Sequence, residues 1–150
     1  MVFKPSLKDI DNIQKLLTPF IEDGVILKRD NNEIASNIRS YIAIKKNNEI
    51  IGIGALHIYS TTLAEIRSLA VLPNYQKIGI GKQIVQELEK EAEILGIEKL
   101  LTLTYQKEFF EKLGFIEIPK ESVPNHKVWS DCIKCPHFPN CNEISLIKTI

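Results

Sequence analysis

The chain has 150 residues, of which 44% are hydrophobic and 25% charged, and its 19 lysines and arginines balance its 19 aspartates and glutamates. This composition is ordinary for a soluble globular protein, and the length predicts a single domain over residues 1–150. A zero net charge provides no field that would attract nucleic acid or an acidic membrane surface, so we expect neither partner. The longest nearly apolar run, residues 50–58, is too short to cross a bilayer.

The cysteines and residues 1–5 indicate the cellular compartment of the protein. Residues 1–5 contain no signal-peptide core, and the three cysteines all lie between positions 132 and 141. An odd number of closely spaced thiols argues against a secreted disulfide scaffold. We therefore expect a cytoplasmic protein.

Hydrophobic periodicity predicts an alternation of strands and helices along the chain. A capping pattern at Ser6 starts the first helix, and Gly24 follows its last apolar residue. Two asparagines, Asn47 and Asn48, form the turn of a predicted hairpin. The expected order is strand, two helices, three strands, helix, strand, helix and two strands, at residues 2–5, 10–20, 30–38, 41–45, 49–59, 64–72, about 82–95, 97–104, 107–113, 115–118 and 143–147.

Residues 64–85 contain the strongest functional signal. A strand ends at Pro73, a loop with two glycines follows, and a helical pattern begins after Gly81. The first N–H groups of a helix have no internal acceptor and lie at the positive end of its dipole. Gly79 and Gly81 let an anion approach the backbone, and Lys77 and Lys82 add positive charge. This segment therefore predicts a phosphate-binding site.

The residues at positions 76, 83 and 84 do not fit two common phosphate-binding motifs. A P-loop would need glycine at 76 and serine or threonine at 83, and both positions are glutamine. A dinucleotide-binding loop would need a third small residue at 84, where Ile84 stands. A plain glycine turn between a strand and a helix is the remaining structural interpretation.

The segment resembles the acetyl-CoA motif of the GNAT superfamily of N-acetyltransferases, Gln/Arg-x-x-Gly-x-Gly/Ala after a strand ending in Leu-Ala-Val-x-Pro. Residues 76–81 and 69–73 match these two patterns, and Phe-Phe-Glu-Lys-Leu-Gly-Phe at 109–115 matches a third. The resemblance implies an α/β GNAT fold, a mixed and mostly antiparallel sheet of about seven strands flanked by about four helices. It also implies acetyl-CoA as cosubstrate and allows a homodimer.

The resemblance assigns the acetyl-CoA contacts. The main-chain amides of Leu69, Ala70 and Val71 would bind the pantetheine arm and the acetyl oxygen. Phe109 and Phe110 would line the channel; core packing is the alternative for both, and it explains Phe109 about equally well. The pyrophosphate would lie on the loop and the helix start, formed by Gln76, Lys77, Ile78, Gly79, Ile80, Gly81 and Lys82.

Two proton-transfer roles follow from the same family. Glu65 occupies the strand position where many members hold a glutamate base that acts through a water, and an exposed strand carboxylate is the alternative. Many members also have a tyrosine acid in Phe-Tyr-Glu-Lys-Leu-Gly-Phe. That position is Phe110 here, which cannot donate a proton. Tyr105 is the candidate substitute, and otherwise the thiolate leaves unassisted because a thiol of pKa ~8.5 is a tolerable leaving group.

Further segments resemble N-acetylglutamate synthases. Residues 24–29 with Glu33 beyond, and residues 64–71, resemble segments of these synthases. The pattern Lys-Val-Trp-x-Asp-Cys-x-x-Cys-Pro-x-Phe-x-x-Cys at 127–141 resembles the end of their short, single-domain form. The resemblance implies acetylation of the α-amine of L-glutamate, in arginine biosynthesis. Lys28, Arg29 and Arg67 are the candidate cations for its carboxylates, against solvated surface charge. Acetylation of a protein N-terminus, a lysine or a polyamine, and a non-catalytic CoA-binding module, are the alternatives.

The cysteine cluster is a candidate metal site. Cys132, Cys135 and Cys141, with His126 or His137 as a fourth ligand, have the residue types of a structural zinc site. Three free or buried thiols are the alternative interpretation.

Overall fold

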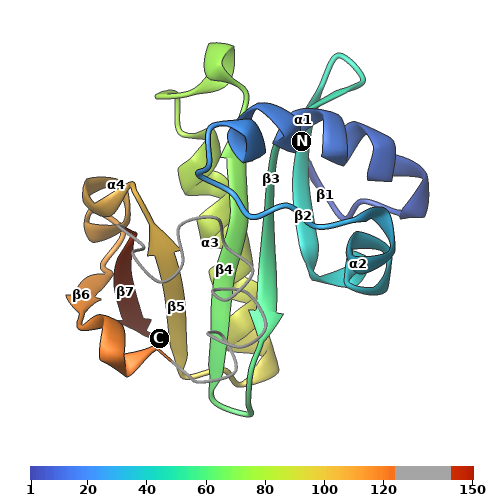
Figure 1. The fold of residues 1–150 in the computed structure, drawn as a ribbon. Helices are drawn as coiled ribbons and strands as arrows, with labels where there is room; N and C mark the ends of the chain where they lie inside the picture. Colours follow the sequence, from blue (N-terminus) through green and yellow to red (C-terminus); the bar gives the residue numbers. More distant parts are fainter. Residues whose placement is uncertain (124–142) are drawn as a thin grey trace.

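The computed structural model describes residues 1–123 and 143–150 (Figure 1). In these residues seven strands form one sheet in the order β1-β2-β3-β4-β5-β7-β6, antiparallel throughout except for the β4–β5 pair. This mixed sheet with its four α-helices confirms the predicted fold class. The elements are β1 (Val2–Phe3), α1 (Ile10–Glu22), α2 (Asn31–Ser36), β2 (Tyr41–Lys46), β3 (Glu49–Ile58), β4 (Leu63–Val71), α3 (Ile80–Leu95), β5 (Lys99–Thr104), α4 (Lys107–Glu111), β6 (Ile116–Ile118) and β7 (Ile144–Thr149).

The predicted order of elements is confirmed, and the differences lie at their ends. The strand expected from residue 97 begins at Lys99, because the Ile97 N–H still donates to the Ala92 carbonyl at 2.9 Å and closes α3. Gly96 permits this closure with a φ of 89°, a left-handed conformation that glycine adopts without strain. No helix in the described ranges is long and apolar enough to cross a bilayer.

Helices cover both faces of the sheet, and the strands divide their side chains between them. Ile42 and Ile44 of β2 belong to the apolar cluster built on α3, whereas Tyr41 and Ala43 belong to the cluster built on α1 and α2. Alternate residues of a strand point to opposite faces, so α3 lies on one face and α1 with α2 on the other, as Figure 1 shows. These are called the α3 face and the α1 face below.

Two glycines of β3 bring α3 close to the sheet. A Cβ atom at Gly52 would lie 2.9 Å from Ile84 Cδ1, and one at Gly54 would lie 2.7 Å from Ile84 Cγ2. Any larger residue would therefore push the helix or its buried Ile84 away. The glycines set how deeply α3, and with it the loop before α3, sits against the centre of the sheet.

Candidate functional site

The site is organised around a fork between β4 and β5. The two strands pair only from Leu63 with Lys99 to Glu65 with Leu101. At the next position the Thr102 side chain, through Oγ1, donates to the Ile66 carbonyl at 3.2 Å, which replaces a main-chain partner. Beyond that point β5 pairs only with β7 in the described residues, so the edge of β4 from residue 67 to 71 faces an opening.

A bulge in β4 lies at the mouth of this fork. Along β3, Ala55 pairs with Arg67 and Ile53 pairs with Ala70, so β4 carries one extra residue there. Ser68 occupies the bulge with a φ of 56°.

The bulge decides which main-chain amides face the fork. The Leu72 N–H donates to the Ile51 carbonyl at 2.9 Å, and the register then makes Ala70 and Ile53 a hydrogen-bonded pair. The amides of Leu69 and Val71 alternate with these and point away from β3, into the fork. Of the three amides expected to bind the pantetheine arm, the geometry makes two available and directs that of Ala70 to β3.

The loop after β4 leads directly to the first turn of α3. Gln76 Nε2 donates to the Val71 carbonyl at 2.8 Å, which ties the loop to the end of the fork. The first helical hydrogen bond runs from the Gln83 N–H to the Gly79 carbonyl at 3.0 Å. The amides of Ile80, Gly81 and Lys82 precede it, and the first turn has neither an acidic residue nor a side-chain cap. An anion would thus meet three amide donors and the helix dipole.

Phe109 connects the loop to the fork, whereas Phe110 does not. A Cβ atom at Gly81 would lie 3.3 Å from Phe109 Cζ and 3.8 Å from Val71 Cγ2. Phe110 is 3% exposed and packs edge-on against Phe109 and Phe115 in the core. Of the aromatic pair, Phe109 is therefore the residue placed to contact a ligand at the start of α3.

Glu65 stands at the last β4–β5 pair, where the fork opens, and its side chain is on the α1 face. It is 1% exposed, so the exposed-carboxylate alternative is wrong. Tyr59 Oη donates to Glu65 Oε1 at 2.7 Å. His57 is paired with Glu65 in the register, and its ring meets that of Tyr59 edge-on at 4.8 Å. Sequence reasoning missed both aromatic residues, although the pairing of His57 with Glu65 places His57 on the face of Glu65 and Tyr59 follows two residues later, just beyond the end of β3.

The charges of two arginines act on Tyr41, which lies on the same face as Glu65. Burial raises the pKa of Tyr41 above its ordinary value of 10.0, and the nearby charges of Arg29 and Arg67 partly oppose that rise. Arg29 is 6% exposed, and its Nη1 lies 2.7 Å from Glu33 Oε2. The positive charges of Arg29 and Arg67 therefore both act on the Tyr41 hydroxyl. Lys28, the third predicted cation, is exposed and is not among the charges that act on Tyr41.

The remaining predicted residues are less constrained. Tyr105 follows the end of β5 and is 38% exposed. In residues 1–123 and 143–150 no group of three or more His, Cys, Asp or Glu side chains could hold a metal ion. The proposed zinc ligands all lie outside the described residues, so the zinc site stays a prediction: Cys132, Cys135, Cys141, His126 and His137.

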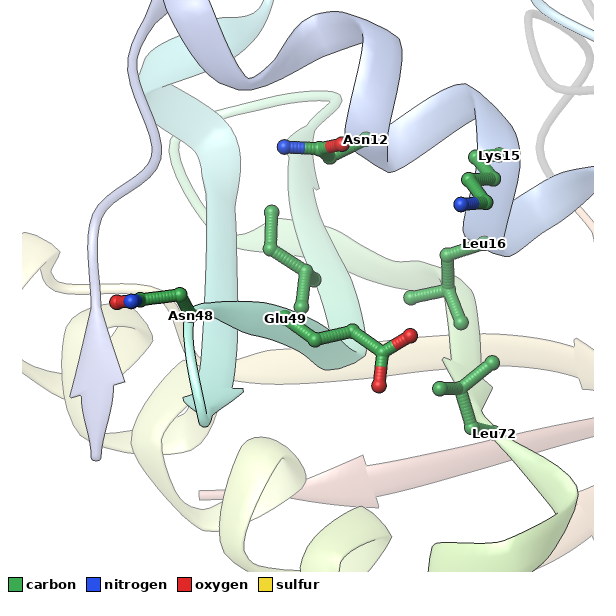
Figure 2. A pocket seen from close by; sticks show the side chains of 7 residues that line it. Asn12, Lys15, Leu16, Asn48, Glu49 and Leu72 are labelled. Carbon is green, nitrogen blue, oxygen red and sulfur yellow. The ribbon is translucent and has the colours of Figure 1, made fainter.

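A cavity of about 340 Å³ lies on the α1 face, beside the turn between β2 and β3 (Figure 2). Figure 2 shows Asn12 and Lys15 on α1 at one side of the opening, and Asn48 and Glu49 at the start of β3 on the other side. Leu72, directly after Val71 of the fork, forms part of its wall. The complete lining is Asn12, Lys15, Leu16, Asn48, Glu49, Ile50 and Leu72.

Comparisons with known proteins identify the family. The model of the acetyltransferase (GNAT) family matches residues 7–115, so the chain belongs to that family. It is 35% identical over 144 residues to an uncharacterized N-acetyltransferase of Chlorobaculum tepidum, covering 96% of this chain and 92% of the relative. It is 30% identical over 121 residues to the amino-acid acetyltransferase of Aeromonas salmonicida, covering 79% of this chain and 27% of the relative. The chain thus spans less than a third of that second relative.

Solved structures share the fold. The N-acetylglutamate synthase from Neisseria gonorrhoeae, in complex with coenzyme A and N-acetyl-glutamate, superposes with a TM-score of 0.89 at 22% identity, covering 99% of this chain and 34% of that one. A Mycobacterium tuberculosis protein in complex with CoA superposes with a TM-score of 0.84 at 23% identity, covering 100% of this chain and 99% of that one.

The chain is an acetyl-CoA-dependent N-acetyltransferase, as its family and relatives show. The residues present suit this cosubstrate. The fork offers two amides on one edge of β4, and the first turn of α3 offers three more beside Lys82 and contains no acidic residue. A glycine stands where a Cβ atom would crowd Phe109.

Proposed function

We propose that this acetyltransferase acetylates the α-amine of L-glutamate. The observation that carries the proposal is that Glu65 and Arg67 share the α1 face of β4 where the fork opens, and that the charges of Arg67 and Arg29 both act on Tyr41 of that face. The names of the relatives, amino-acid acetyltransferase and N-acetylglutamate synthase, support the same acceptor class. The biological role that follows is arginine biosynthesis in the cytoplasm.

Glu65 is the proposed base. When bound, acetyl-CoA supplies a thioester carbonyl that the amine attacks and a thiolate that leaves. Before attack the amine must lose a proton, and a buried carboxylate at the mouth of the fork can accept it directly or through one water. The Tyr59 hydroxyl donates to Glu65 Oε1 and so orients the carboxylate at the mouth of the fork. The amides of Leu69 and Val71 polarise the acetyl oxygen.

Arg29 and Arg67 are the proposed anchors for the two carboxylates of glutamate. Burying an unpaired carboxylate costs several kcal/mol, so a dicarboxylic acceptor needs cations in its site. Arg67 is half-buried on β4, two residues from Glu65 and on the same face. Arg29 pairs with Glu33 through Nη1 and is a buried cation on this side of the sheet. A polyamine would instead require surplus carboxylates, and Glu33 is engaged by Arg29.

The proposal is tested by the release of CoA with a panel of acceptors: L-glutamate, L-lysine, spermidine and a peptide amine. We expect L-glutamate to have the highest kcat/KM. Arg67→Met should raise the KM for glutamate roughly 10–100-fold, because a charge-assisted pair is lost, and should leave acetyl-CoA affinity unchanged. Arg39→Met, at an exposed arginine, is the matched control and should change neither. Equal turnover of glutamate and lysine would contradict the proposal.

A further inference from the structure

The main-chain hydrogen bonds between β4 and β5 alternate regularly up to the point where the fork opens. The Lys99 N–H donates to the Thr62 carbonyl at 3.0 Å, next to the first pair of the parallel register, Leu63 with Lys99. In a parallel pair every second residue of each strand bonds to its neighbour, so before the bulge the even-numbered residues of β4 face the odd-numbered residues of β5. The Ile66 carbonyl therefore faces β5, and a regular ladder would pair it with the Leu103 N–H.

Thr102 takes the place of that N–H. Its Oγ1 donates to the Ile66 carbonyl at 3.2 Å, and the residue is buried, with 2% of its surface exposed. In the described residues the register of β4 and β5 ends before this position, whereas β5 goes on pairing with β7 as far as Thr104. The carbonyl thus keeps a donor, which a buried acceptor needs, while the Leu103 N–H points from β5 into the opening.

We propose that Thr102 is a positioning residue that satisfies the Ile66 carbonyl in place of the Leu103 N–H, and so frees this amide to donate to a carbonyl oxygen of bound acetyl-CoA. The arm of the cosubstrate has amide and thioester carbonyls that can accept such a hydrogen bond. The amides of Leu69 and Val71 face the fork from β4, so a ligand there would meet donors on both sides. The inference rests on the acetyl-CoA role of the fork and not on the identity of the acceptor amine.

Amide hydrogen exchange of the wild-type protein tests whether the Leu103 amide is free. Without ligand it should exchange at least about tenfold faster than the Leu101 amide, which lies within the paired part of β4 and β5. Saturating acetyl-CoA, without an acceptor amine, should slow the exchange of the Leu103 amide roughly tenfold or more. A Leu103 amide as protected as that of Leu101 in the free protein, or one that acetyl-CoA does not protect, would overturn the inference.

Thr102→Val keeps the shape of the side chain and removes the hydroxyl, so the Ile66 carbonyl must take another donor. The Leu103 N–H is the next donor of the ladder. Its exchange in the ligand-free variant should therefore slow roughly tenfold, and the calorimetric affinity for acetyl-CoA should fall roughly 3–10-fold, the net effect of one hydrogen bond. Thr102→Ser keeps the hydroxyl and should stay within about twofold of the wild type in both measurements.

Thr18→Val is the matched control. Thr18 Oγ1 also donates to a main-chain carbonyl, that of Gln14 at 2.7 Å, but within α1, so its loss should change neither measurement. If Thr102 only stabilised the fold, Thr102→Val would lower the urea midpoint and leave acetyl-CoA affinity unchanged, which would contradict the inference. An equal loss of affinity in Thr102→Ser would also contradict it. The exchange experiment needs only the wild type, so it tests the inference even if Thr102→Val does not fold.

Discussion

The substitution Gly81→Asp, at the start of α3, should weaken acetyl-CoA binding without destabilising the free protein. The new Cβ atom would lie 3.3 Å from Phe109 Cζ and 3.4 Å from Cε1, a contact that the half-buried ring can relieve by a small shift. A carboxylate in the first turn of a helix that has no acidic residue there stabilises it by about 0.3–1 kcal/mol. The substitution also replaces a helical glycine by aspartate, whose helix propensity is better by only a few tenths of a kcal/mol, roughly 0.1–0.3. We therefore expect the free protein to be as stable as the wild type, or slightly more.

The same carboxylate should repel the pyrophosphate. Like charges about 4 Å apart repel by about 1–4 kcal/mol in water or at a protein surface. This energy corresponds to a loss of acetyl-CoA affinity between roughly fivefold and several hundredfold, smaller at high salt. Calorimetric titration with acetyl-CoA and thermal unfolding of the free protein measure the two effects. Gly81→Asn has the same size without the charge and should lose much less affinity. Gly81→Asp that binds within about twofold of the wild type would refute the loop assignment, and equal losses in both variants would refute its electrostatic basis.

Four further predictions follow from the site and the core. Glu65→Gln should lower kcat/KM by roughly 10²–10⁴ and remove the acidic limb of the pH–rate profile with acetyl-CoA affinity preserved, and an unchanged profile would assign the base elsewhere. Gly54→Ala should cost about 1–3 kcal/mol in urea unfolding, because its Cβ atom would lie 2.7 Å from Ile84 Cγ2, and an unchanged midpoint would show that α3 is free to move. Because burial raises the pKa of Tyr41, this tyrosine ionises at a lower pH in the unfolded chain than in the folded protein. The stability that the neutral tyrosine contributes is therefore complete below its ordinary pKa of 10.0 and is lost as pH rises through the folded-state pKa. The midpoints of urea unfolding should therefore fall more between about pH 9 and 11 in the wild type than in Tyr41→Phe. Equal falls in the two proteins would contradict a raised pKa for Tyr41. Metal analysis of untagged protein should find about one zinc per chain, and three titratable thiols without metal would contradict a site at Cys132, Cys135 and Cys141.

The order of elements could be read from the sequence because it depends on local patterns. The helical spacing of apolar residues, the glycines that end helices and the asparagine turn each act within a few residues. The shared face of Glu65 and Arg67 is local too, since residues two apart in a strand point the same way. The acetyl-CoA loop was recognisable because its glycines and the residues before them are contiguous.

The remainder of the site depends on register between strands, which no short pattern encodes. The row of Tyr41, Ala55 and Arg67 exists only once β2, β3 and β4 are aligned. Ser68 gives no sign in the sequence that it will form a bulge, because serine has no preference for positive φ. The separation of Phe109 from Phe110 likewise follows from the packing of α4 against the core.

The ratio of kcat/KM for L-glutamate to kcat/KM for L-glutamine is the most direct test of the proposed acceptor specificity. The two amino acids have nearly the same shape and the same α-amine, and they differ in the side-chain carboxylate for which an arginine of the α1 face is proposed. With saturating acetyl-CoA, we expect kcat/KM for L-glutamate to exceed that for L-glutamine by roughly tenfold or more, the value of a charge-assisted hydrogen bond. Arg67→Met or Arg29→Lys should reduce this ratio. Equal values for the two acceptors in the wild type, or no acetylation of either, would contradict the account.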